Sequence, residues 1–188
     1  MEKVNIIIGR FQPFTKGHYK CIKHAYKKLN IATVICMIDT KEEKVDKKHP
    51  FPTSINKPIL ESLFKNDKLV KDIILVKNAD IVKIGEKLYD KKLQAVSWVC
   101  GSDRVQSYQK MASKYKEQAH LPEDFKVLEI PRTGEDISAT KVRNALLDDN
   151  FDLFKKLTPY TSLDKYIKGE DKDIYNIFRK QILLVYDK

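Results

Sequence analysis

Residues 4–18 read Val-Asn-Ile-Ile-Ile-Gly-Arg-Phe-Gln-Pro-Phe-Thr-Lys-Gly-His, and this stretch decides the fold. Its apolar run, Val4–Gly9, is typical of a buried strand. The segment after the turn predicts a helix over Gly17–Leu29, because its apolar residues recur at helical spacing: Cys21, Ile22, Ala25 and Leu29. A glycine turn that enters a helix offers free amide groups and the positive end of the helix dipole, so it is a ready anion site.

The same alternation of strand and helix patterns continues along the chain. β-rich apolar runs predict five strands: Val4–Gly9, Ile31–Asp39, Asp72–Lys77, Ala95–Gly101 and Phe125–Pro131. Helical spacing of apolar residues predicts five helices between and after these strands: Gly17–Leu29, Thr53–Phe64, Asp80–Lys92, Ser102–Glu117 and Ser138–Leu147. Three hydroxyl residues are candidate N-caps: Thr53, Ser102 and Ser138. Right-handed crossovers then predict an α/β fold, a Rossmann-like, doubly wound, parallel five-stranded sheet with helices on both faces and a short helical C-terminal extension.

The length of 188 residues favours one domain over two. We expect residues 1–150 to form the Rossmann-like domain and residues 151–188 to form a helical C-terminal extension of that domain. The charged segment Thr40–Pro52 contains two prolines and predicts a surface loop. Ligands of doubly wound sheets bind at the carboxyl ends of the strands, so the turns after the first and fourth strands are the candidate site.

The composition is that of a globular protein, with 42% hydrophobic and 33% charged residues, and no apolar run approaches the length of a membrane span. The first residues enter a strand directly and leave no room for a signal peptide, so we expect a cytoplasmic protein. The three cysteines are Cys21, Cys36 and Cys100. Their odd number and their apolar surroundings favour reduced structural thiols over disulfides or a zinc site.

The net charge of +10 invites a nucleic-acid partner, because basic faces attract phosphate backbones. Only five of the 36 basic residues are arginines, however, and the lysines are spread along the whole chain among acidic residues. A diffuse lysine excess is typical of a solvated surface. We therefore expect neither a nucleic-acid nor a membrane partner, although the positive field favours an anionic nucleotide substrate.

Three residues of the first turn suit a triphosphate. Gly17 lets the backbone approach a ligand closely, His18 in the first helical turn can donate to a phosphate oxygen, and Arg10 adds a cation. Taken singly, each has a structural explanation as a helix start, a cap or a surface charge. Together, at the carboxyl end of the first strand, they favour a binding site.

A second turn, Gly134-Glu135-Asp136-Ile137-Ser138-Ala139-Thr140-Lys141-Val142-Arg143, enters another helix. The hydroxyls of Ser138 and Thr140 can donate to phosphate oxygens, and the guanidinium of Arg143 can pair with them in forked geometry. A capped helix with a surface arginine is the simpler explanation of this motif when it is considered alone.

Together, the two turns resemble the signatures of the HxGH nucleotidylyltransferases, (His or Thr)-x-Gly-His and Ile-Ser-x-Thr-x-x-Arg. The Gly-Arg-x-Gln-Pro lead-in is most similar to nicotinamide-nucleotide adenylyltransferases of the archaeal and related types. The resemblance implies that His18 binds the ATP phosphates and stabilises the transition state, with Arg143 and Arg10 as further catalytic cations. Position 15 is histidine in many members and threonine here. The implied ATP-binding residues are Gly9, Arg10, Phe11, Thr15, Gly17, His18, Ile137, Ser138, Thr140 and Arg143.

The resemblance also implies an acceptor site after the fourth strand. Gly101 and Asp103 match a Gly-x-Asp that contacts ribose or the acceptor, although the helix dipole alone also favours an acid at position 103. Phe14 and Tyr108 are candidates for stacking on the acceptor ring, whereas Trp98 lies in a strand pattern that favours core packing. A looser match to the family's Asn-Pro-Phe segment and Glu-Arg helix borders the acceptor site: His49-Pro50-Phe51-Pro52, Lys57 and Glu61.

The activity implied is transfer of AMP from ATP to nicotinamide mononucleotide (NMN), or to nicotinate mononucleotide (NaMN), with Mg²⁺ bound through the ATP phosphates and no metal ligands from the protein. Gln12 stands where cytidylyltransferases and pantetheine-phosphate adenylyltransferases carry an acid, which favours NMN. A cytidylyltransferase or an adenylyltransferase with another small phosphorylated acceptor is the first alternative. A non-catalytic nucleotide sensor or nucleic-acid-binding protein on the same fold is the second. The sequence is compatible with a homo-oligomer.

Overall fold

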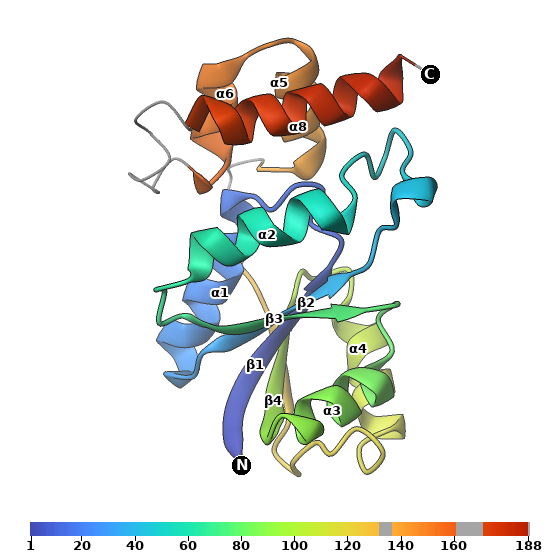
Figure 1. The fold of residues 1–188 in the computed structure, drawn as a ribbon. Helices are drawn as coiled ribbons and strands as arrows, with labels where there is room; N and C mark the ends of the chain where they lie inside the picture. Colours follow the sequence, from blue (N-terminus) through green and yellow to red (C-terminus); the bar gives the residue numbers. More distant parts are fainter. Residues whose placement is uncertain (132–136, 161–170, 188) are drawn as a thin grey trace. The chain divides into compact units, whose positions relative to one another are not determined.

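The computed structural model describes residues 1–131, 137–160 and 171–187, and the chain divides into two compact units (Figure 1). The first, which we call the sheet unit, consists of Met1–Gly9, Lys20–Ile38 and Lys68–Gly134. The second, which we call the helical unit, consists of Arg10–Tyr19, Asp39–Asp67 and Glu135–Lys188. The predicted division at residue 150 stays a prediction.

The sheet unit contains five parallel strands in the order β3-β2-β1-β4-β5, with β1 at the centre (Figure 1). The strands are β1 (Glu2–Gly9), β2 (Thr33–Ile38), β3 (Val70–Val76), β4 (Leu93–Cys100) and β5 (Lys126–Glu129). The chain moves outward from β1 to β3 and then returns to β4 on the other side of β1. This reversal is the topological switch point of a doubly wound fold, and the predicted fold class is confirmed.

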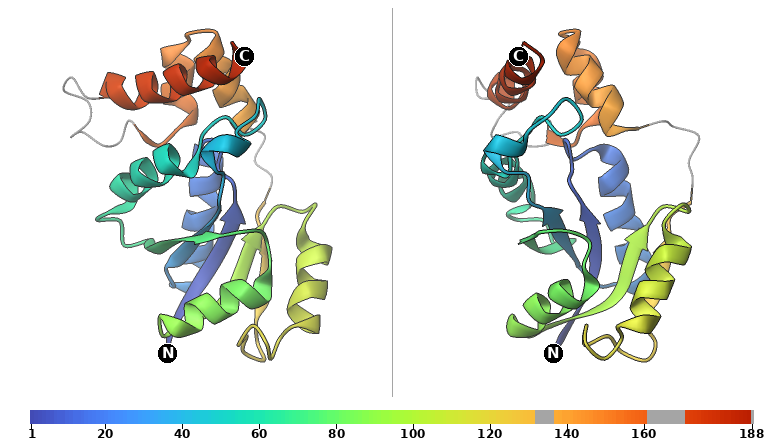
Figure 2. Two further views of the ribbon diagram at one scale, coloured as in Figure 1. Left: turned by 45° about the vertical axis from the view of Figure 1, so that its right-hand side comes forward. Right: turned by 90° about the vertical axis from the view of Figure 1, so that its right-hand side faces the viewer.

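Helices cover both faces of the sheet (Figure 2). On one face, α3 (Ile81–Asp90) and α4 (Val105–Lys114) bury a large cluster together with Val4, Ile6 and Trp98. On the other, Ala25 and Cys21 of α1 (Lys16–Leu29) pack with Val99 and Leu128. Residues of one strand point to alternate faces, which explains why neighbours Trp98 and Val99 belong to different clusters.

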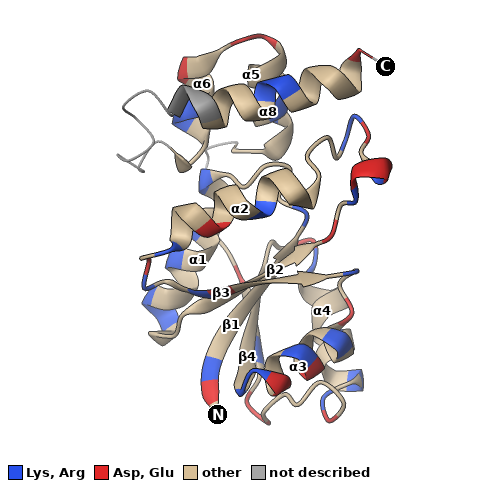
Figure 3. Ribbon diagram, in the orientation of Figure 1, with Lys and Arg blue, Asp and Glu red and all other residues tan. Residues whose placement is uncertain are grey.

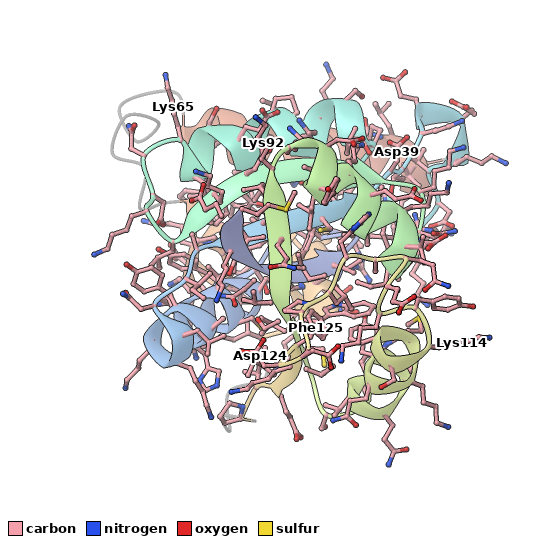
Figure 4. The ribbon with its side chains drawn as sticks, turned by 90° about the horizontal axis from the view of Figure 1, so that it is seen from below. Asp39, Lys65, Lys92, Lys114, Asp124 and Phe125 are labelled. Atoms are coloured by element: carbon pink, nitrogen blue, oxygen red, sulfur yellow. The ribbon has the colours of Figure 1, made fainter. Side chains whose placement is uncertain are left out.

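Trp98 is fully buried and stacks on Tyr108, with ring centroids 3.6 Å apart and 11° between the planes. The expectation of core packing for Trp98 is confirmed. The turns that lead into the last two strands carry Lys92, Asp124 and Phe125 (Figure 4). Lys92 adopts a left-handed φ of 60°, and the Phe125 N–H closes its turn by donating to the Pro122 carbonyl at 3.1 Å.

Two of the three predicted N-caps are wrong. α4 begins only at Val105, because residues 102–104 form a turn in which the Arg104 N–H donates to the Gly101 carbonyl at 3.1 Å. Pro52 occupies the N-cap of α2 (Thr53–Phe64), and the Thr53 hydroxyl instead accepts from the Thr40 N–H at 2.8 Å. Ser138 caps α5 (Ala139–Leu147), as predicted.

The helical unit includes α2, α5 (Ala139–Leu147), α6 (Phe151–Leu157) and α8 (Asp171–Tyr186). Its apolar interior contains rings from loop and tail: Phe51, Phe154, Tyr160 and Phe178. Arg179 of α8 donates through Nε to the Leu146 carbonyl at the end of α5 at 3.1 Å. Gln181 of the same helix donates to the Pro50 carbonyl at 3.1 Å. The helix α8 therefore holds both α5 and the loop that contains Pro50.

Segment Thr40–Pro52 is a loop with one short 3₁₀ turn, η1 (Glu42–Lys44), and residues 41–44 and 46–48 are exposed, as predicted. None of the three cysteines forms a disulfide. Burial raises the pKa of Cys21 to about 12 and that of Cys100 to about 11, which fits structural thiols. Lysines and arginines are dispersed over helices of both units (Figure 3). No helix in the described ranges has the length and apolarity required to cross a membrane.

Candidate active site

The first turn is fixed to the rest of the helical unit by two buried amide side chains. Phe11 adopts a left-handed φ of 53°, a strained conformation for a bulky residue, and its carbonyl accepts from Asn56 Nδ2 at 2.6 Å. The Gln12 amide pairs with the backbone of Phe51 in both directions, donating to its carbonyl at 2.8 Å and accepting from its N–H at 2.9 Å. These bonds hold the turn against α2 and the Thr40–Pro52 loop.

Thr15 and His18 close the N-terminus of α1 reciprocally. The Thr15 hydroxyl accepts from the His18 backbone N–H at 3.4 Å, and His18 Nδ1 accepts from the Thr15 backbone N–H at 3.0 Å. This is a capping box in which histidine takes the place usually held by glutamate or glutamine. Because Nδ1 is an acceptor, the neutral imidazole carries its proton on Nε2.

The His18 ring lies against two phenylalanine rings, with centroids 5.0 Å from Phe11 and 5.2 Å from Phe14. Burial among these apolar groups lowers the pKa of His18 to about 4. His18 is therefore a neutral hydrogen-bond donor at physiological pH. Among the described residues, none engages its Nε2.

The second predicted turn meets the first at Gly17. A Cβ on Gly17 would lie only 3.1 Å from the Ile137 carbonyl oxygen and 3.3 Å from Thr15 Oγ1, so the close approach of the two backbones favours glycine here. Ser138 follows as the N-cap of α5, its hydroxyl accepting from the Lys141 N–H at 3.2 Å. The N-termini of α1 and α5 thus come together, 120 residues apart in sequence. The predicted residues Gly134–Asp136 lie outside the described ranges.

Arg143 of α5 is anchored beside the first turn. Its Nη1 donates to the Gln12 carbonyl at 2.8 Å and its Nη2 donates to the Thr140 hydroxyl at 3.2 Å. A guanidinium has five N–H donors, and these two bonds fix its plane. Burial lowers the pKa of Arg143 from its usual value, while Tyr186 and Asp46 act in the opposite direction, and the guanidinium remains charged at any physiological pH.

Arg10 is more loosely held. It is exposed, and its Nη1 reaches the Thr40 hydroxyl at 3.4 Å, the long limit of a hydrogen bond. His49 of the neighbouring loop has a lowered pKa because of burial and the Arg10 charge, although Asp46 acts in the opposite direction. Arg10 is thus a cation with freedom to move toward an anionic ligand.

Taken together, the helical unit brings two helix N-termini, the neutral donor His18 and the cations Arg10 and Arg143 into one region. Helix N-termini and arginines bind phosphate oxygens. Within the described ranges no group of three or more histidine, cysteine, aspartate or glutamate side chains could hold a metal ion. The donor set fits a polyphosphate.

The predicted acceptor residues differ in placement. Gly101 and Asp103 are exposed in the turn after β4 of the sheet unit, with Asp103 Oδ1 against the Gly101 backbone, and Gly9 ends β1 of the same unit. Tyr108 is 8% exposed and one face is covered by Trp98. Phe14 is fully buried against Phe64, with centroids 5.3 Å apart. Stacking of either ring on an acceptor stays a prediction and would require that ring to become more exposed.

Sequence reasoning missed two residues that build the site. Asn56 holds the strained Phe11 carbonyl, and an asparagine in a helical pattern gave no signal of that role. The sequence marks Gln12 only as an indicator of the acceptor class, whereas its side chain is 5% exposed and binds the loop backbone. In the sequence, Gln12 lies between Phe11 and Phe14, and a polar side chain in this apolar stretch was the available signal for a buried anchor.

A family model described as cytidylyltransferase-like matches residues 6–145 of the chain. A search of curated proteins finds no match. Among solved structures, a candidate nicotinate-nucleotide adenylyltransferase from Vibrio parahaemolyticus has a TM-score of 0.60 at 15% identity, covering 95% of this chain and 99% of that one. The Plasmodium falciparum nicotinic acid mononucleotide adenylyltransferase in complex with APC has a TM-score of 0.57 at 13% identity, covering 95% and 98%. The same Plasmodium enzyme in complex with NaAD has a TM-score of 0.56 at 14% identity, with the same coverage. These likenesses extend over the whole fold.

Proposed function

This chain belongs to the cytidylyltransferase-like family and is a nucleotidyltransferase, and from that premise we propose that it transfers AMP from ATP to NMN, forming NAD and pyrophosphate. The observation that carries the proposal is the meeting of the two helix N-termini at Gly17, with His18 and Arg143 beside it. The structural neighbours named as nicotinate-nucleotide adenylyltransferases support a pyridine mononucleotide as acceptor. NaMN is the alternative acceptor of the same chemistry.

We propose a direct, in-line displacement. A phosphate oxygen of the acceptor attacks the α-phosphorus of ATP, the bond from that phosphorus to the bridging oxygen breaks, and pyrophosphate leaves with the electron pair. The chain's contribution is positioning and charge stabilisation. His18 donates from Nε2 to the α-phosphate. The imidazole is already neutral at working pH, so it keeps its Nε2 proton and acts as a hydrogen-bond donor.

In this proposal, the second turn binds the departing pyrophosphate. Arg143 offers N–H donors beyond the two that anchor it, and the Ser138 and Thr140 hydroxyls add further donors. The backbone around Gly9, Phe11, Gly17 and Ile137 lines the nucleotide, and Arg10 closes on the phosphates. Mg²⁺ bound to the phosphates would supply charge neutralisation.

From the family resemblance we propose that Gly101 and Asp103 contact the acceptor, with Phe14 and Tyr108 as alternative candidates for the ring that stacks on it. Asp103 is an exposed carboxylate that can accept from ribose hydroxyls. The aromatic rings require rearrangement before they can stack, so this part of the proposal rests on the family resemblance.

The test is pyrophosphate release from Mg²⁺-ATP, and separately from Mg²⁺-CTP, with NMN or NaMN as acceptor. We expect turnover with ATP and a pyridine mononucleotide, and a fall of about 10²- to 10³-fold in His18→Ala, the usual cost of one transition-state donor. His24→Ala, on the same helix, is the matched control.

Each other outcome contradicts a defined part of the proposal. Turnover with CTP alone would replace the nucleotide donor, and turnover with NaMN alone would replace the acceptor. ATP binding without turnover on any acceptor would favour a nucleotide sensor. Undiminished activity of His18→Ala would remove His18 from the mechanism.

A further inference from the structure

We propose that Thr15 is a positioning residue that holds the His18 imidazole in one orientation and one neutral tautomer, and that it does not contact the nucleotide. This inference rests on the proposed function for its catalytic consequence. It differs from the direct ATP contact that the sequence led us to expect at this position.

The contacts of Thr15 are all directed to α1. Its backbone N–H donates to His18 Nδ1 at 3.0 Å, its hydroxyl lies 3.2 Å from the same nitrogen and accepts from the His18 N–H at 3.4 Å, and its carbonyl accepts from the Tyr19 N–H at 3.1 Å. The residue is 1% exposed. Every polar group of Thr15 therefore has a partner within the helix, and almost no surface is left for a ligand.

The tautomer follows from these contacts. A backbone N–H can only donate, so Nδ1 facing it must present its lone pair, and the ring proton is on Nε2. A phosphate oxygen accepts hydrogen bonds and cannot donate them when ionised. The Nε2–H tautomer binds it, whereas the Nδ1–H tautomer would present a lone pair to the phosphate.

The packing supports the same arrangement. Phe11 meets the imidazole edge-on at 86° and Phe14 lies tilted at 38°, so the ring has apolar neighbours from the turn that the capping box closes. Rotation of the ring would break the Nδ1 bond without offering a polar partner among these neighbours. A donor fixed before substrate binds requires no reorganisation during the reaction.

The experiment compares Thr15→Val, which keeps the shape and removes the hydroxyl, with Thr15→Ser, which keeps the hydroxyl. The first readout is ¹⁵N NMR of the His18 imidazole in the substrate-free protein, where the two nitrogens report the tautomer. We expect a single Nε2–H tautomer in wild type and Thr15→Ser. Thr15→Val keeps the N–H that faces Nδ1 but loses the hydroxyl that caps the His18 N–H, so the first turn of α1 should loosen, the bond to Nδ1 should weaken and a mixture of tautomers should appear.

The second readout is steady-state kinetics with ATP varied. Since the hydroxyl acts through His18, Thr15→Val should lower kcat by between about tenfold and about 10²-fold, the upper figure being what a 1 Å misplacement can cost. The KM for ATP should change little. Asn150→Ala removes the N-cap of α6, where Asn150 accepts from the Leu153 N–H at 3.1 Å. It controls for the loss of a helix cap and should leave both the His18 signals and kcat unchanged.

Two results would overturn the inference. One is a Thr15→Val protein with wild-type His18 signals, and the other is a rise in the KM for ATP at constant kcat, which would indicate direct contact with the nucleotide. The NMR measurement needs no substrate, so it decides the role of Thr15 even if the acceptor proves to be different.

Discussion

His18 is a histidine that stays neutral across the physiological pH range, and this has a thermodynamic consequence. Its pKa is lowered to about 4 in the folded chain by burial beside Phe11 and Phe14, against 6.5 in the unfolded chain. Between these values the unfolded state binds a proton that the folded state does not. The contribution of His18 to the free energy of unfolding therefore falls as pH decreases from 6.5 toward 4.

We predict that His18→Gln reduces this loss of stability, because glutamine does not titrate and can both accept from the Thr15 N–H and donate outward. Urea unfolding of wild type and variant at pH 7 and pH 5 measures the difference, whose slope is limited to about 1.4 kcal/mol per pH unit. The partly exposed His49 also has a lowered pKa, so His49→Gln is the comparison. Equal pH dependence in wild type and His18→Gln would contradict the burial assigned to His18.

A second prediction at this scale concerns Gly17. Gly17→Ala places a Cβ 3.1 Å from the Ile137 carbonyl oxygen, so α5 must shift by a few tenths of an ångström. We expect a loss of about 1 kcal/mol in stability, net of the helix propensity gained, and a larger relative loss in turnover because α5 carries Arg143. Chemical unfolding and pyrophosphate release measure the two effects.

Lys16→Ala is the control, since it changes the adjacent position of α1 without adding volume. The explanation would be wrong if Gly17→Ala were as active as Lys16→Ala, because close approach of the two turns would then not matter.

At the scale of elements, the site depends on a loop and two helices that are joined by single side chains. The Gln12 side chain joins the first turn to the loop by pairing with the Phe51 backbone. The Gln12 backbone carbonyl accepts a hydrogen bond from Arg143 of α5. We predict that Gln12→Leu lowers the free energy of unfolding by about 2–5 kcal/mol, because it leaves a buried N–H and a buried carbonyl of Phe51 without partners.

Thermal or urea unfolding tests this prediction, with Gln109→Leu as control. Gln109 is exposed on α4, so the same substitution there should change stability by no more than about 0.5 kcal/mol. Similar effects of the two substitutions would mean that the pairing of Gln12 with Phe51 is not formed in solution.

Elements were also where the sequence was most informative. Strand and helix positions followed from apolar periodicity, because alternation and helical spacing are local properties, and the ends differ by at most three residues. The N-cap at Ser102 failed because the turn after β4 satisfies its backbone groups internally, through the Arg104 N–H and Gly101 carbonyl. The motifs located His18 and Arg143, whereas the roles of Asn56, Gln12 and Thr15 depend on contacts between distant segments or on burial that no local pattern encodes.

For the molecule as a whole, the net charge is +10, of which the sheet unit contributes +8 (18 basic and 10 acidic residues) and the helical unit +2 (18 basic and 16 acidic residues), and the proposed substrate is a polyanion. A positive field raises the local concentration of ATP and is screened as salt increases. We predict that the KM for ATP rises several-fold between about 0.01 and 0.15 M NaCl, while kcat at saturating ATP changes little. Steady-state kinetics at constant pH and Mg²⁺ measures this, and a KM that is independent of salt would show that the field is not used.

The assembly of the helical unit from segments distant in the sequence determines the order in which the site can be completed. The strands end at Glu129, but Arg143, and the α8 contacts that hold α5 and the loop, come later in the chain. During synthesis, the segment with His18 leaves the ribosome early, and the site stays incomplete until α5 and α8 have been synthesised. A chain interrupted after its last strand would therefore have the first turn with His18 but lack Ser138, Thr140 and Arg143, and we expect such a fragment to bind ATP more weakly than the finished protein.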